Sequence, residues 1–180
     1  MSEDQPGLRE RLVTVAMEML TSGTSELSLR SVARGAGVSA MAPYRHFPDK
    51  AALLRAVADR GFEMLREALE AADARGSGRD ALAAQGMAYF GFAAEHPALF
   101  RLMFSDLCAP PNPADAGPGA HSVLARRVAS IVADPAAAET ATIAAWAIVH
   151  GLALLALDGT LPIDSDRARS VLSLFANGLA

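Results

Sequence analysis

The chain has 180 residues, of which 52% are hydrophobic and 20% are charged, with one cysteine and a net charge of −4. A chain of this length can bury a sizeable core, and Cys108 alone excludes an internal disulfide. Alanine is abundant and β-branched or aromatic runs are scarce, so the composition predicts an all-α fold.

Three helices are predicted at the start of the chain. Apolar residues at helical spacing predict the first over residues 8–20. Ser28 is expected to cap a short second helix that Gly37 closes. A third short helix is predicted over residues 39–46, with Ser39 as its cap. Two short helices joined by a tight glycine-containing turn are the helix-turn-helix pattern.

A longer fourth helix is predicted from its cap, Asp49, to about residue 74. Two glycines and a serine at residues 75–78 then make the clearest break in the chain. We therefore predict a helix-turn-helix domain over residues 1–57, a connecting helix to about residue 75, and a helical body over residues 79–180.

Five more helices are predicted in the body, which gives about nine in all. Their expected ranges are 80–95, 97–104, 121–133, 135–157 and 164–177, with a Pro-rich loop over 106–119. The longest apolar stretch, Ala141–Leu157, has 17 residues, fewer than the roughly 20 needed to span a bilayer. It is interpreted as a buried or interface helix, and no membrane partner is expected.

The positive charge is concentrated near the predicted helix-turn-helix. The segment from Ser28 to Arg60 has six basic and two acidic residues, a net charge of +4, which leaves −8 for the remainder. A basic patch on an acidic molecule suits a polyanion that docks at one place. The same charges are also compatible with an ordinary solvated helix face.

A helix-turn-helix reads DNA by placing one short helix in the major groove while its neighbours contact phosphates. The residues expected to face base edges are Ser39, Ala40 and Met41. Arg30 is the candidate for a guanine contact. Tyr44, His46 and Lys50 are candidates for phosphate contacts, the last near the positive N-terminal end of the fourth helix.

Four segments together resemble the TetR family of transcriptional regulators. They are Leu29-Arg30-Ser31-Val32-Ala33, Gly37-Val38-Ser39, Tyr44-Arg45-His46-Phe47 and Lys50-Ala51-Ala52-Leu53-Leu54. The resemblance implies an all-helical homodimer whose N-terminal domains bind a palindromic operator in double-stranded DNA. It also implies phosphate contacts at Ser28, Tyr44, His46 and Lys50, and base contacts at Arg30 and residues 39–41.

One position departs from the family pattern. Pro43 stands where the family commonly has a bulky aliphatic residue before the tyrosine. Proline removes the hydrogen bond to the Ser39 carbonyl and is expected to push the helix start toward tighter geometry.

The second half is similar to the regulatory domains of this family that carry a Trp-His-Gly signature, here Trp146, His150 and Gly151. Trp146 and His150 lie four residues apart and therefore share a helix face. The last two helices are expected to form a four-helix interface with their symmetry mates.

A regulator of this kind needs a cavity for a small hydrophobic effector. The candidate lining residues are Met87, Tyr89, Phe90, His96, Phe100, Met103, Phe104, Trp146 and His150, with Phe92 nearby. The alternative is that the bulky residues among them are simply core.

Catalysis is not predicted. The four histidines have no paired ligand spacing, Cys108 has no nearby basic partner in the sequence, and no phosphate-binding glycine loop is present. No catalytic residue, metal or cofactor is therefore expected. The residues are most consistent with a cytoplasmic, dimeric, ligand-responsive repressor. An activator of the same architecture, or a small-molecule-binding protein with a degenerate DNA-binding head, are the alternatives.

Overall fold

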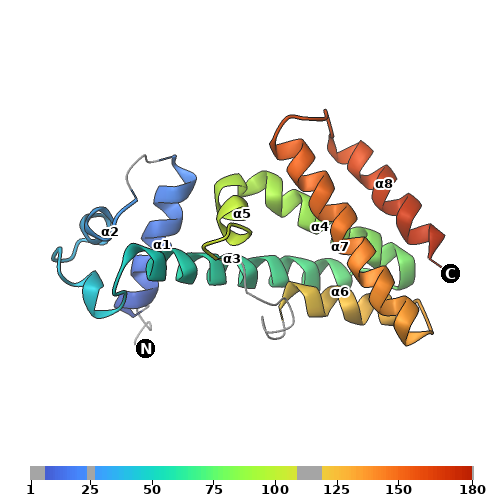
Figure 1. The fold of residues 1–180 in the computed structure, drawn as a ribbon, viewed down its shortest axis with the longest axis horizontal. Helices are drawn as coiled ribbons and strands as arrows, with labels where there is room; N and C mark the ends of the chain where they lie inside the picture. Colours follow the sequence, from blue (N-terminus) through green and yellow to red (C-terminus); the bar gives the residue numbers. More distant parts are fainter. Residues whose placement is uncertain (1–6, 24–26, 109–118, 180) are drawn as a thin grey trace. The chain divides into compact units, whose positions relative to one another are not determined.

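The computed structural model of the protein describes residues 7–23, 27–108 and 119–179. All regular structure in these ranges is helical (Figure 1), which confirms the predicted all-α class. The α-helices are α1 Leu8–Thr21, α2 Leu29–Gly35, α3 Lys50–Asp73, α4 Gly78–Glu95, α5 Pro97–Met103, α6 Ala120–Ala129, α7 Pro135–Leu157 and α8 Ser165–Gly178. One short 3₁₀ helix, η1, spans Pro43–Arg45.

The predicted caps Ser28 and Asp49 are confirmed, and two further aspartates cap helices in unit 2. Ser28 caps α2 in a capping box, because its hydroxyl accepts from Ser31 N–H at 3.1 Å and its own N–H donates to the Ser31 hydroxyl at 2.9 Å. Asp49 accepts from Ala52 N–H at 2.7 Å at the start of α3. Asp134 and Asp164 cap α7 and α8 in the same way.

The short helix predicted over residues 39–46 is present only as the 3₁₀ helix η1 at Pro43–Arg45. Ala42 N–H donates to the Ser39 carbonyl at 2.9 Å in a turn, and η1 follows as a single 3₁₀ turn. Pro43 has no N–H to bond the Ser39 carbonyl, and its ring is buried, so the backbone is held in the tighter geometry.

The chain forms two compact units. Unit 1 comprises residues 1–61 and 96–109, and unit 2 comprises residues 62–95 and 110–180. The division falls within α3, whereas the sequence places the boundary in the loop at residues 75–78, between α3 and α4. Unit 1 also includes α5, because α5 packs against α1 and the sulfur of Met103 lies close against Gly61.

The core of unit 1 lies between α1, α2, α5 and the first part of α3. Its most buried side chains include Leu12, Val32, Phe47, Leu53 and Phe100, each at most 2% exposed. Gly37 ends the α2 region with a φ of +68°, a conformation that costs an L-residue roughly 1–2 kcal/mol. The turn that follows α2 therefore depends on this glycine.

In unit 2, α4 packs against α6, α7 and α8, while α7 also packs against α6 and α8. One cluster of its core consists of Leu82, Val128, Val132, Ala138 and Ala176. These residues come from α4, α6, α7 and α8 and from the segment after α6, so the cluster holds four helices together.

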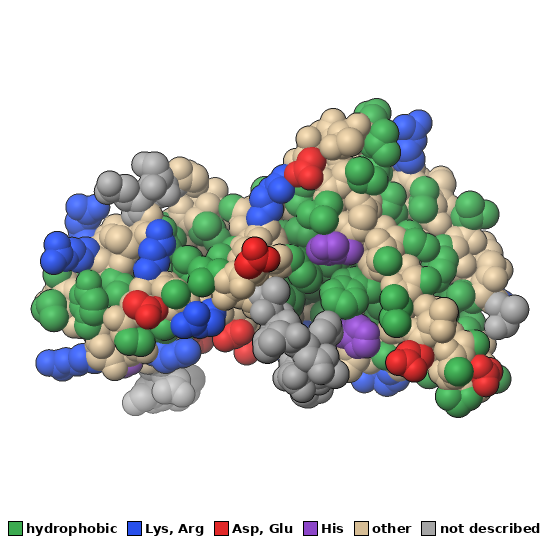
Figure 2. Space-filling view, viewed as in Figure 1, with side chains coloured by type: hydrophobic (Ala, Val, Ile, Leu, Met, Phe, Trp, Pro, Cys, Tyr) green, Lys and Arg blue, Asp and Glu red, His purple; other side chains and the backbone are tan. Residues whose placement is uncertain are grey.

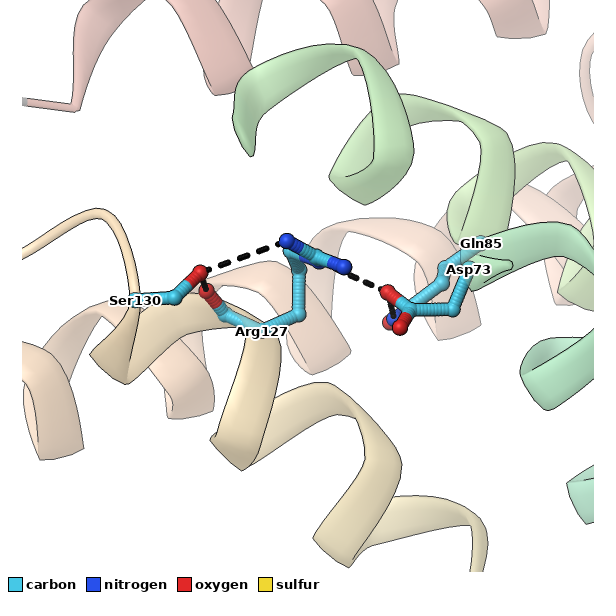
Figure 3. A network of polar contacts seen from close by, with 4 residues as sticks. All are labelled: Asp73, Gln85, Arg127 and Ser130. Carbon is cyan, nitrogen blue, oxygen red and sulfur yellow. Dashed lines mark hydrogen bonds and ion pairs between the residues drawn. The ribbon is translucent and has the colours of Figure 1, made fainter. Parts of the chain in front are cut away.

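A polar network ties three of the helices in unit 2 (Figure 3). It consists of Asp73 at the end of α3, Gln85 on α4, Arg127 on α6 and Ser130 just after α6. Arg127 Nε and Gln85 Nε2 both donate to Asp73 Oδ1 at 2.6 Å. The hydrogen bond from Arg127 lowers the pKa of Asp73, so this carboxylate is ionised at neutral pH.

Candidate nucleic-acid interface and ligand site

The residues predicted to contact DNA all lie in unit 1. Arg30 is exposed on α2, and Lys50 is exposed as the first residue of α3. The exposed positions of the turn between α2 and η1 are Ser39, Ala40 and Met41. Tyr44 and His46 are exposed in and after η1, whereas Ser28 is half-buried and its hydroxyl caps α2.

Two of these side chains are unusual for an exposed surface. Met41 is 68% exposed and Tyr44 is 42% exposed, although both are large and mainly apolar. Pro43 lies between them in the sequence, and its buried ring holds the turn against the core of unit 1. An apolar group exposed beside hydrogen-bonding groups suits contact with a thymine methyl in the major groove.

Positive charges outnumber the exposed carboxylates Asp49 and Asp59 around this turn. Arg34, Arg45, Arg55 and Arg60 are exposed in unit 1 in addition to Arg30 and Lys50. On the face drawn in Figure 2, Lys and Arg side chains are frequent over α1 and α2. This surface offers cations for contact with phosphates and a narrow exposed turn for contact with base edges. Sequence-specific DNA binding requires both kinds of contact.

The predicted ligand-lining residues are divided between the two units. His96, Phe100, Met103 and Phe104 belong to unit 1, where Phe100 and Met103 are fully buried in the core. The others belong to unit 2, and they are Met87, Tyr89, Phe90, Trp146 and His150.

In unit 2 the structure brings three of these residues together with a histidine that the sequence did not suggest. Tyr89 Oη lies 2.8 Å from His150 Nδ1. The Trp146 ring centroid lies 6.4 Å from that of His150 and 5.7 Å from that of His121, both edge to face. We call Tyr89, His150, Trp146 and His121 the aromatic strip.

Burial shifts the pKa values of Tyr89 and His150 in the aromatic strip. It lowers the pKa of His150, and it raises the pKa of Tyr89 well above its usual range, so both are neutral at pH 7. The Tyr89 hydroxyl and His150 Nδ1 form a hydrogen bond whose direction is set by the tautomer of the imidazole.

His121 and Gln85 are the residues that sequence reasoning missed. His121 lies 25 residues before Trp146 and on another helix, so no spacing connects the two. Gln85 carried a signal, because it is a lone polar residue one turn before Tyr89 on an otherwise apolar helix face.

The aromatic strip predicts a pH dependence of stability. The unfolded chain protonates His150 at a pKa of about 6.5, whereas the folded protein resists its protonation, so stability is complete above that pH and is lost as the pH falls. We expect His150→Asn, which retains an acceptor near Nδ1 but does not titrate, to lose less stability between about pH 7.5 and about pH 5.

Chemical denaturation at the two pH values measures this difference. His46→Asn, at an exposed histidine of unit 1, is the matched control and should behave as the wild type does. An equal fall in the free energy of unfolding for the wild type and His150→Asn would contradict the prediction.

Two family models match the chain. Residues 12–57 match the model described as bacterial regulatory proteins of the tetR family. Residues 82–177 match a model described as the tetracyclin repressor-like C-terminal domain. Neither description mentions a Trp-His-Gly subtype, which stays a prediction. Comparison with curated proteins gives no significant match.

Solved structures share the fold over almost the whole chain. A protein of unknown function from Rhodococcus sp. RHA1 is 34% identical, with a TM-score of 0.80 over 100% of this chain and 99% of its own. A TetR family transcription regulator from Marinobacter aquaeolei VT8 is 18% identical, with a TM-score of 0.66 over 94% and 93%. A TetR variant from Acinetobacter baumannii AYE in complex with minocycline is 20% identical, with a TM-score of 0.63 over 92% and 90%.

Proposed function

The chain belongs to the TetR family of transcriptional regulators, which are DNA-binding proteins and not enzymes, and from this we propose that it is a homodimeric, cytoplasmic repressor. It binds a palindromic operator and leaves it when a small hydrophobic effector binds. The observation that carries the proposal is the exposed turn of unit 1 that bears Met41, together with the exposed cations Arg30 on α2 and Lys50 at the start of α3.

We assign the proposed functions to the two predicted domains. Residues 1–57 bind DNA, and residues 79–180 bind the effector and the second copy. The minocycline complex of the Acinetobacter relative supports effector binding as a property that this fold can carry. Helix α3 begins with Lys50, a proposed phosphate contact, and ends with Asp73 in the polar network, so one helix joins the two functions.

The proposed dimer uses the open faces of α7 and α8. On α7 the stripe of Ile143, Ala147, Gly151 and Leu155 faces outward, with Ile143 59% exposed. On α8, Leu174 is 77% exposed. A second copy would cover these side chains by twofold symmetry, and such pairing would set the spacing of two DNA-binding domains.

Helix α7 is also long and apolar enough to cross a membrane, by length and composition alone, and only 22% of its most apolar window is buried. In unit 2, however, α4, α6 and α8 pack against it, so it is a central helix of a helical unit with one face left open. The dimer accounts for the open face, because α8 continues it with Leu174.

Binding to DNA from upstream of the protein's own gene tests the proposal. Fluorescence anisotropy should show tight binding to this fragment and weak binding to a scrambled duplex, and the binding should weaken steeply between about 50 and about 200 mM salt. Weak binding to both duplexes, with little salt dependence, would contradict a DNA-binding function at this fragment and favour a degenerate head. A rise in transcription from the bound DNA when the protein binds would favour the activator.

A further inference from the structure

Gln85 is a buried side chain, and only one of the two polar atoms of its amide has a hydrogen-bond partner among the described residues. It is 2% exposed, its Nε2 donates to Asp73 Oδ1 at 2.6 Å, and no described residue donates a hydrogen bond to its Oε1. The ionised Asp73 carboxylate can only accept, so the amide nitrogen must face Asp73 and the amide oxygen must face elsewhere. A buried carbonyl oxygen in this state favours a molecule that brings it a donor.

The position of Gln85 links the two groups of side chains described above. Gln85 and Tyr89 lie one turn apart on α4 and so share a face of that helix. The aromatic strip starts at Tyr89 and reaches α6, and the polar network starts at Gln85 and also reaches α6. The helices α4, α6 and α7 pack against one another in pairs. Both sets of contacts therefore connect α4 with α6 inside unit 2.

The residues of the aromatic strip differ in exposure, and the most buried of them is Tyr89, the one nearest to Gln85 along α4. His121 is exposed, Trp146 and His150 are half-buried, and Tyr89 is 4% exposed. Figure 2 shows histidine side chains at the surface among hydrophobic ones on the face that it draws. Along the aromatic strip, burial therefore increases from His121 on α6 to Tyr89, which lies one turn from Gln85 on α4.

The charges of this region select the ligand class. Asp73 and Arg127 pair at 2.6 Å, and Tyr89 and His150 are neutral, so none of these four side chains offers an unpaired charge to an ionic ligand. The rings of the aromatic strip favour a flat aromatic molecule. We propose that unit 2 binds an uncharged, planar aromatic ligand whose N–H or O–H group donates a hydrogen bond to Gln85 Oε1 and whose ring lies against the aromatic strip.

This inference rests on the proposed effector-binding function, and three related probes test it. Indole and 3-methylindole each carry one N–H donor, whereas 1-methylindole has the size of 3-methylindole and no donor. Isothermal titration calorimetry of the full-length protein should show both donors binding about tenfold more tightly than 1-methylindole, the size of one hydrogen bond to a buried acceptor. Trp146 is the single tryptophan, so its indole N–H resonance in a nitrogen-edited NMR spectrum should shift and place the probe at the aromatic strip.

A variant of the acceptor completes the test. Gln85→Met should reduce the tenfold preference to about twofold or less, since it removes the amide oxygen and retains the volume. Thr142→Val is the matched control, because Thr142 is 4% exposed and its hydroxyl already donates to the Ala138 carbonyl at 2.8 Å. This control should keep the full preference.

The outcomes separate this proposal from the proposed function. Equal affinities of the wild type for 1-methylindole and 3-methylindole would overturn the role of Gln85 and leave effector binding standing. Absence of binding by all three probes, with a Trp146 resonance that does not move, would overturn the ligand class. Sequence-specific DNA binding by the same preparation would still support the regulator.

Discussion

Arg30→Ala is expected to lower the affinity for the operator by about tenfold or more at each half-site and to relax the preference for one base pair. Arg30 is exposed on α2, next to the turn that carries Met41, and its guanidinium is the group in this surface best suited to a guanine edge. A lost base contact of this kind typically costs about 1–3 kcal/mol, and a dimer loses it twice.

The measurement is a set of anisotropy titrations against a site selected from random duplexes and against single-base-pair variants of that site. Arg75→Ala is the matched control, because it removes the same charge from an exposed position in unit 2. Lys50→Ala provides a contrast, since loss of a phosphate contact should lower the salt slope by about one unit per head and leave base preference unchanged. If Arg30→Ala kept the base preference and changed only the salt slope, Arg30 would be a phosphate contact.

The fold was largely predictable because its local signals agree with its packing. The caps Ser28 and Asp49 each satisfy a backbone N–H at the helix start where the sequence placed them. Helical spacing of apolar residues then indicated which face of each helix is buried. These signals act over one or two turns, and so a single sequence reveals them.

The segment around Pro43 has a structure that local sequence signals predict only in part. The sequence predicts that proline tightens the helix start, but it does not predict that the helix over residues 39–46 is reduced to the 3₁₀ helix at Pro43–Arg45. The outcome depends on burial of the Pro43 ring in the core of unit 1, which is a tertiary contact. The base-facing residues of the prediction are therefore presented by a turn and a 3₁₀ helix.

The ligand site shows the same limit at longer range. The spacing of Trp146 and His150 on one helix places them on a common face, and the sequence predicts this. The contacts of Trp146 with His121 and of Asp73 with Gln85 join different helices, and no spacing in the sequence encodes them. Phe100 and Met103 were predicted beside the same site, whereas the structure buries both in unit 1.

Leu174→Glu is expected to convert the dimer into a monomer and to lower operator affinity to the level of a single half-site. Leu174 is 77% exposed on α8, so the isolated chain tolerates a charge there at little cost in folding stability. In a twofold interface the substitution acts twice, and each buried carboxylate lacks a partner. The expected loss is more than about a thousandfold in the dimer association constant, because a buried unpaired charge costs several kcal/mol.

Sedimentation velocity over a range of protein concentrations measures the effect directly. Leu107→Glu is the matched control, because Leu107 is also exposed, at 42%, but lies in unit 1 and outside α7 and α8. The control should remain dimeric. Gly151→Ala adds a finer probe, because a Cβ at Gly151 meets no atom of the described residues within 4 Å outside its two chain neighbours and the adjacent backbone of its own helix. Alanine there should stabilise α7 by up to about 1 kcal/mol in the monomer, and should weaken dimerisation only if the partner's backbone approaches closely at that point. A dimeric Leu174→Glu protein with unchanged operator affinity would show that the open face of α8 lies outside the interface.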